Sequence, residues 1–206
     1  FEGCSGISEI SFGEGLATVG SYSFKGCDAL TKVRFGKGLT EIKDYVFTGL
    51  KNLQSVNIPY TAKKFGNGTF AGCTALSTVT FDQTPAGETP EILTWGSGSG
   101  TTTISSSTTT PYPYTDKFGV HYHGTFAGCT ALKSLEIPEG RMNALPTYAF
   151  IGSGLESFTI PASMTTINSY AFNYTKLKSI TIPHTVISLG IAFGGCDELA
   201  SVVFEE

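Results

Sequence analysis

The feature that most constrains this sequence is an internal repeat with a nearly constant period. A segment beginning at Gly68 recurs letter for letter at Gly124. Copies of the pattern begin at phenylalanines whose even spacing is interrupted once, between the fourth and the fifth, namely Phe1, Phe24, Phe47, Phe70, Phe126, Phe150, Phe172 and Phe193. Because a unit this short cannot bury its own apolar edge, the units must stack into a repeat solenoid.

Each unit contains an apolar pattern that ends in alternation with period two, as in Leu30-x-x-Val33-x-Phe35. Such alternation is typical of a short strand with one buried face. Four of these strands are followed directly by a proline: Pro59, Pro138, Pro161 and Pro183. Proline has no backbone donor, which suits a position where strand pairing stops. We therefore predict one strand in each coil and a parallel β-sheet along one face.

The other half of each unit, such as residues 40–47, is too short for a long helix. We expect turns and a short helical or 3₁₀ segment that ends at a Phe-x-Gly corner, where glycine permits a positive φ. The whole chain, 1–206, is then one solenoid of about eight coils whose phenylalanines form one buried column.

The period and the Leu-x-x-Leu-x-Leu core resemble a leucine-rich repeat. The full unit is similar to the BspA-like leucine-rich-repeat class, with Tyr148-Ala-Phe150 before Ile160-Pro161 and Tyr170-Ala-Phe172 before Ile182-Pro183. The resemblance covers residues 1–81 and 115–206. It implies a bacterial or protozoan surface protein that adheres to a protein or glycan of a host or neighbouring cell. The Asn that follows the strand in better-known leucine-rich repeats is missing, so an arched horseshoe does not follow.

Composition and charge argue against several other functions. The 13 basic residues form no run and the net charge is −4, which disfavours binding to nucleic acid or to an anionic membrane surface. No apolar stretch approaches the roughly 20 residues that a membrane span needs. The chain opens in the middle of a repeat, and we interpret it as part of a longer protein whose further repeats or domains contact this one.

No motif for catalysis is recognisable: the sequence has no phosphate-binding loop, nucleophile elbow or recurring carboxylate pair. We therefore predict neither catalysis nor a cofactor. His121 and His123 are the only pair with metal-like spacing, and alternation along a strand would place both on one face. The alternative is a solvated loop without a metal, since two ligands alone do not define a site.

All five cysteines occupy one repeat position, the third after the corner phenylalanine: Cys4, Cys27, Cys73, Cys129 and Cys196. In the other coils this position holds Leu50, Ser153 and Thr175, which is the tolerance of a packing site. A disulfide framework and a metal site are the alternatives. Side chains in register point in parallel rather than at one another, and no Cys-x-x-Cys occurs. We predict five reduced, buried thiols.

The pattern breaks after Phe81, and an insertion that spans 82–114 interrupts the fourth coil. The repeat resumes near Phe118, which aligns with Phe65. Residues 91–95 and 101–105 either pair as a hairpin or stay irregular. The insertion and its flank hold aromatic residues that we predict to anchor a ligand: Trp95, Tyr112, Tyr114 and Tyr122. A tolerated solvent loop without function is the alternative.

Outward-facing positions of the predicted strands form two rows of mostly small hydroxyl residues. Lys32 and Arg34 stand out among them as candidate ligand contacts. Serine and threonine also suit an exposed sheet for structural reasons alone. The leading prediction is therefore an extracellular binding or adhesion module, and the alternative is a structural spacer that holds other domains away from the cell surface.

Overall fold

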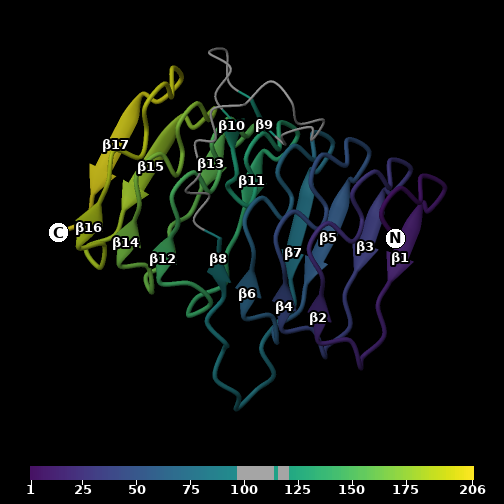
Figure 1. Cartoon of the computed structure of the whole chain (residues 1–206). Helices are drawn as coiled ribbons and strands as arrows, with labels where there is room; N and C mark the ends of the chain where they lie inside the picture. The colour runs from purple at the N-terminus through teal and green to yellow at the C-terminus, as the bar shows by residue number, and fades with distance from the viewer. Residues whose placement is uncertain (97–113, 116–120) are drawn as a thin grey trace.

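The computed structural model describes residues 1–96, 114–115 and 121–206, which form a solenoid with its two termini at opposite ends (Figure 1). The front sheet strands are β1 (Glu9–Ser11), β3 (Lys32–Arg34), β5 (Ser55–Ile58), β7 (Thr78–Phe81), β11 (Ser134–Leu135), β13 (Ser157–Phe158), β15 (Ser179–Ile182) and β17 (Ser201–Phe204). The strands of the second face are β2 (Thr18–Val19), β4 (Glu41–Ile42), β6 (Lys64–Phe65), β8 (Thr94–Trp95), β12 (Ala144–Leu145), β14 (Thr166–Ile167) and β16 (Ser188–Leu189). A further pair, β9 (Tyr114–Thr115) and β10 (His121–Tyr122), is antiparallel.

Strands of neighbouring coils pair in parallel, which confirms the predicted solenoid with a parallel sheet on one face. In the front sheet Glu9 pairs with Lys32, which pairs in turn with Ser55, so each step is one repeat. The pairing is parallel because each coil brings the chain back to the same edge before the next strand begins.

The second face differs from the prediction in one respect. Within the described residues it carries short strands and turns, and the expected helical or 3₁₀ segments are not seen there. Left-handed residues at the corners reverse the chain instead. Gly26 has a φ of 76°, as the Phe-x-Gly motif predicts, and Tyr45 has a φ of 57°. The sequence pattern did not predict the left-handed tyrosines.

The eight corner phenylalanines form one stacked column. Successive ring centroids lie 5.2 to 5.7 Å apart, and every ring pair is stacked. The column continues across the insertion, since the rings of Phe70 and Phe126 are 5.4 Å apart. The core thins out at each terminal coil, where Phe1 is 67% exposed and Phe204 of β17 is 63% exposed.

The cysteines are free thiols that line one edge of this column. Cys27, Cys73 and Cys129 are buried, as predicted, whereas Cys196 is half-buried. The prediction that Cys4 is buried is wrong, because Cys4 in the first coil is exposed. The Cys73 thiol donates to the Phe47 carbonyl at 3.0 Å, and burial raises its pKa to about 12. Each buried thiol thus serves the stacking of one coil on the coil before it.

Candidate binding surface

The outer face of the front sheet carries the two predicted rows of polar side chains. The register brings Ser11, Arg34 and Asn57 together in one row, and Glu9, Lys32 and Ser55 in the other. Arg34 is exposed and Lys32 is half-buried. Both cations therefore lie in the second coil on the same face of the sheet, where a ligand can reach them together.

The front sheet is not continuous along the solenoid. It is divided into β1-β3-β5-β7, β11-β13 and β15-β17. A hollow lies at each interruption. The one at β7 and β11 is lined by Val79, Thr80, Phe81, Gln83, Glu136, Pro138 and Glu139. The other, at β13 and β15, is lined by Ser157, Phe158, Thr159, Ile160, Ser179, Ile180, Thr181, Pro183 and Glu205.

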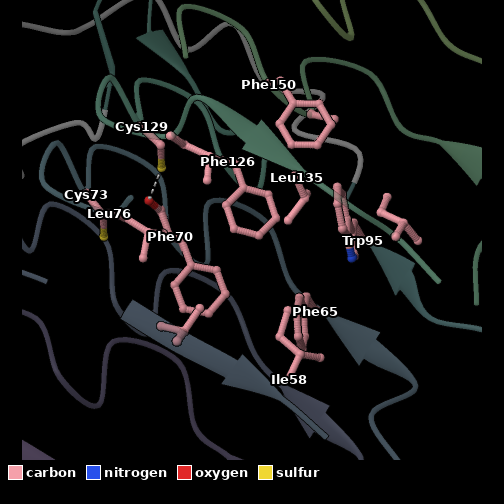
Figure 2. Close-up of a cluster of buried hydrophobic side chains, with 14 of the residues drawn as sticks. Ile58, Phe65, Phe70, Cys73, Leu76, Trp95, Phe126, Cys129, Leu135 and Phe150 are labelled. Atoms are coloured by element: carbon pink, nitrogen blue, oxygen red, sulfur yellow. Dashed lines mark hydrogen bonds between the residues drawn. The ribbon is translucent and has the colours of Figure 1, made fainter. Parts of the chain in front are cut away.

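Trp95 belongs to the core, and its expected position as a surface anchor is wrong. Its side chain is 7% exposed and meets Phe126 and Phe150 edge-on, with ring centroids 5.1 and 5.6 Å apart (Figure 2). Its backbone pairs with Phe65 in β6. The indole is therefore not available to an external ligand.

This placement divides the insertion into two stretches. The first lies between Phe81 and Trp95 and is about twice as long as the equivalent stretch of another coil. The second runs from Trp95 to Phe126 and replaces the short step that joins Phe65 to Phe70. Within the first half of the expected hairpin of residues 91–95 with 101–105, β8 pairs in parallel with β6. Residues 101–105 lie outside the described chain.

The second stretch returns to the solenoid through β9 and β10, in which Tyr114 pairs with Tyr122 and Thr115 with His121. The structure thus brings the backbones of two predicted contact residues together. Tyr112 lies outside the described residues.

Of the two histidines that the sequence offered as a metal-ligand pair, His123 is a buried side chain. His123 is 7% exposed and packs edge-on against the Tyr45 ring, with centroids 5.3 Å apart. In the described part of the chain no three His, Cys, Asp or Glu residues are grouped to hold a metal ion. His123 therefore has a packing role at the corner beside Gly68, where a Cβ would come within 2.6 Å of Tyr45.

Arg141 is a buried residue that the sequence pattern did not single out. It is 1% exposed, and its guanidinium donates to the carbonyls of Tyr60 at 2.7 Å and Ala62 at 3.1 Å. It also donates to the carbonyls of Pro59 and Glu91. Burial lowers its pKa, and the Glu91 carboxylate opposes that shift. The sequence holds one signal that could have pointed to Arg141. The stretch that follows Pro138 is slightly longer than the equivalent stretch that follows Pro161 in the next coil.

Ion pairs between coils line the rim of the front face. Glu156 lies between Lys133 and Lys178, at 3.0 and 2.8 Å, and these lysines lower its pKa to about 2. This arrangement joins one side chain from each of the fifth, sixth and seventh coils, whereas Lys32 and Arg34 form no ion pair with another described residue. No helix in the described residues is long and apolar enough to span a membrane.

The family model described as BspA type leucine rich repeat region matches in six copies over residues 1–87 and 122–206. No curated protein matches the sequence.

Solved structures with the same fold include two from bacteria. One is a leucine rich cell surface protein from Faecalibacterium prausnitzii, with 21% identity and a TM-score of 0.65 over 96% of this chain and 48% of that one. Another is a leucine-rich repeat protein from Bacteroides ovatus, with 18% identity and a TM-score of 0.56 over 100% of this chain and 57% of that one. The chain thus spans about half the length of these proteins, and the likeness establishes the fold.

Proposed function

The chain belongs to the BspA-type leucine-rich-repeat family, and we propose that it is a cell-surface binding or adhesion module that recognises a protein or glycan without catalysis. The observation that carries this proposal is the front face, a regular platform of small polar side chains with two cations in one coil. A leucine-rich cell surface protein of the same fold supports the location.

We place the ligand contact at Lys32 and Arg34 and at the pair formed by β9 and β10, which carries Tyr114 and Tyr122. The cations supply charge-assisted hydrogen bonds, and the tyrosines supply amphipathic contact area at low entropy cost. Trp95 is left out of this contact because it is buried.

The test uses fluorescently labelled protein, a glycan array, and cultured epithelial cells with and without protease or glycosidase treatment. Binding to at least one probe is expected to fall in the double variant Lys32→Ala with Arg34→Ala. The matched control is Lys37→Ala with Lys51→Ala, which removes the same charge from exposed positions elsewhere. Equal loss in both variants contradicts the proposed contact. Absence of binding to every probe favours the structural spacer.

A further inference from the structure

The fourth and fifth coils stay stacked at their corner but part along the front strands. At the corner, the Phe70 amide donates to the Thr125 carbonyl at 3.0 Å, and the Gly72 amide to the Ala127 carbonyl at 2.7 Å. The Ala131 amide still reaches the Thr74 carbonyl at 3.2 Å. Beyond that point β7 and β11 do not pair, and the hollow begins. We refer to this hollow, with its lining given above, as the β7–β11 cleft.

Two bulky side chains between the fourth and fifth coils explain the separation. Trp95 occupies a position that holds Ile42, Leu145 or Ile167 in other coils, and its indole projects toward the fifth and sixth coils (Figure 2). Arg141 is buried in the same region and bonds to carbonyls of the third coil. Excess side-chain volume in a packed core forces backbone shifts, and here β7 and β11 are not paired.

The cleft has a partly exposed apolar floor. Val79 and Phe81 of β7 are half-buried, whereas the equivalent Val56 and Ile58 of β5 are 2% and 0% exposed. Pro138 completes the apolar part of the lining. At this interruption, side chains whose equivalents are covered in another coil are therefore exposed to solvent.

The rim of the cleft is acidic. Glu136 and Glu139 lie on its fifth-coil side, and the lining holds no cation. Neither carboxylate forms an ion pair with another described residue, although Glu139 accepts a hydrogen bond from the Ala162 amide at 2.9 Å. Arg141, which follows Glu139 closely in the chain, points at carbonyls of the third coil. The negative charge of the rim is therefore available to a partner.

We propose that the β7–β11 cleft binds an extended basic peptide segment of another protein by receiving one of its lysine or arginine side chains. The aliphatic stem of such a side chain lies on Val79 and Phe81 while its cationic head meets Glu136 and Glu139. The cleft lies where β7 and β11 are not paired, so its apolar floor and acidic rim are open to one inserted side chain. This site shares no residue with the contact at Lys32 and Arg34 and does not depend on it.

The experiment is a fluorescence anisotropy titration of the full chain with two short labelled peptides of equal length, one alternating Thr and Lys and one alternating Thr and Glu. The lysine peptide is expected to bind and the glutamate peptide to fail. The variant Glu136→Gln with Glu139→Gln is expected to weaken the lysine peptide roughly tenfold, the loss of two solvent-screened ion pairs. The matched control, Glu9→Gln with Glu14→Gln, removes the same charge from exposed positions of the first coil.

A second variant, Thr80→Lys, places an internal cation in the cleft from an exposed position and is expected to abolish binding of the lysine peptide. Thermal unfolding checks that each variant is folded. Equal weakening in the control variant, binding of the glutamate peptide, or unchanged binding in Thr80→Lys would overturn the proposal. The Lys32→Ala with Arg34→Ala variant is expected to bind the lysine peptide normally, which separates this site from the proposed surface function.

Discussion

The backbone of Trp95 pairs with that of Phe65 in the parallel register that joins neighbouring coils, although the chain between them is longer than one repeat. Elsewhere on the second face, Ile42 and Phe65 pair across a single repeat of ordinary length. The additional residues before Trp95 form a longer connection, and the pairing of Trp95 with Phe65 stays intact. Trp95 is consequently a structural residue inside what the sequence pattern marks as an insertion.

Substitution of Trp95 tests this placement. We expect Trp95→Ala to lower the free energy of unfolding by about 3–5 kcal/mol, because it removes a buried aromatic side chain from between packed rings. The neighbouring Ile92 is 49% exposed, and Ile92→Ala is expected to change stability by less than about 0.5 kcal/mol. Urea denaturation measures both. Similar small effects would place Trp95 on the surface.

The phenylalanine column predicts a contrast between its centre and its end. Phe70 is fully buried between Phe47 and Phe126, and Phe70→Ala should cost about 3–5 kcal/mol of unfolding free energy. Phe1 stacks on Phe24 alone and is 67% exposed, so Phe1→Ala should cost much less. Equal midpoints of thermal unfolding for the two variants would contradict a continuous column.

The thiols are expected to differ in reactivity. Cys4 should react with a disulfide reagent in the native protein, while Cys27, Cys73 and Cys129 should react only after denaturation. Burial raises the Cys73 pKa from 9.0 to about 12, so the folded protein keeps the thiol neutral while the unfolded chain ionises. The stability that the neutral Cys73 thiol contributes to the folded state is therefore present below pH 9.0 and is lost as the pH rises toward about 12. Cys73→Val should reduce this loss in pH-dependent urea denaturation; an unchanged loss would contradict the assignment.

Arg141 links the fifth coil to the third, and its removal should be costly. We expect Arg141→Met to lower the free energy of unfolding by about 3–5 kcal/mol, because four carbonyls lose their donor and two of these hydrogen bonds are buried. Arg141→Lys should recover only part of the stability, since an ammonium lacks the planar fork. The exposed Arg34 supplies the control Arg34→Met, with little expected change. Thermal unfolding compares the three variants, and an unchanged midpoint for Arg141→Met would contradict this role of the guanidinium.

Much of the fold could be predicted because its signals are local and repeated. The alternation in Leu30-x-x-Val33-x-Phe35 specifies one buried strand face, and its repetition at a nearly constant period specifies stacking. The left-handed Gly26 follows from the Phe-x-Gly motif, since glycine adopts that φ without strain. The left-handed Tyr45 carried no such signal, because nothing in its local sequence demands a positive φ.

What the sequence by itself determined is therefore the repeat, the parallel strands, the phenylalanine column and the shared cysteine position. It did not determine which aromatic residue completes the fourth coil, because Trp95-Gly96 and Phe118-Gly119 satisfy the same local pattern. Only the tertiary structure shows that Trp95 completes the fourth coil, because Trp95 pairs with Phe65 and packs against Phe126. The buried Arg141 and the β7–β11 cleft were equally out of reach, because they arise from contacts between coils rather than from the periodicity within one.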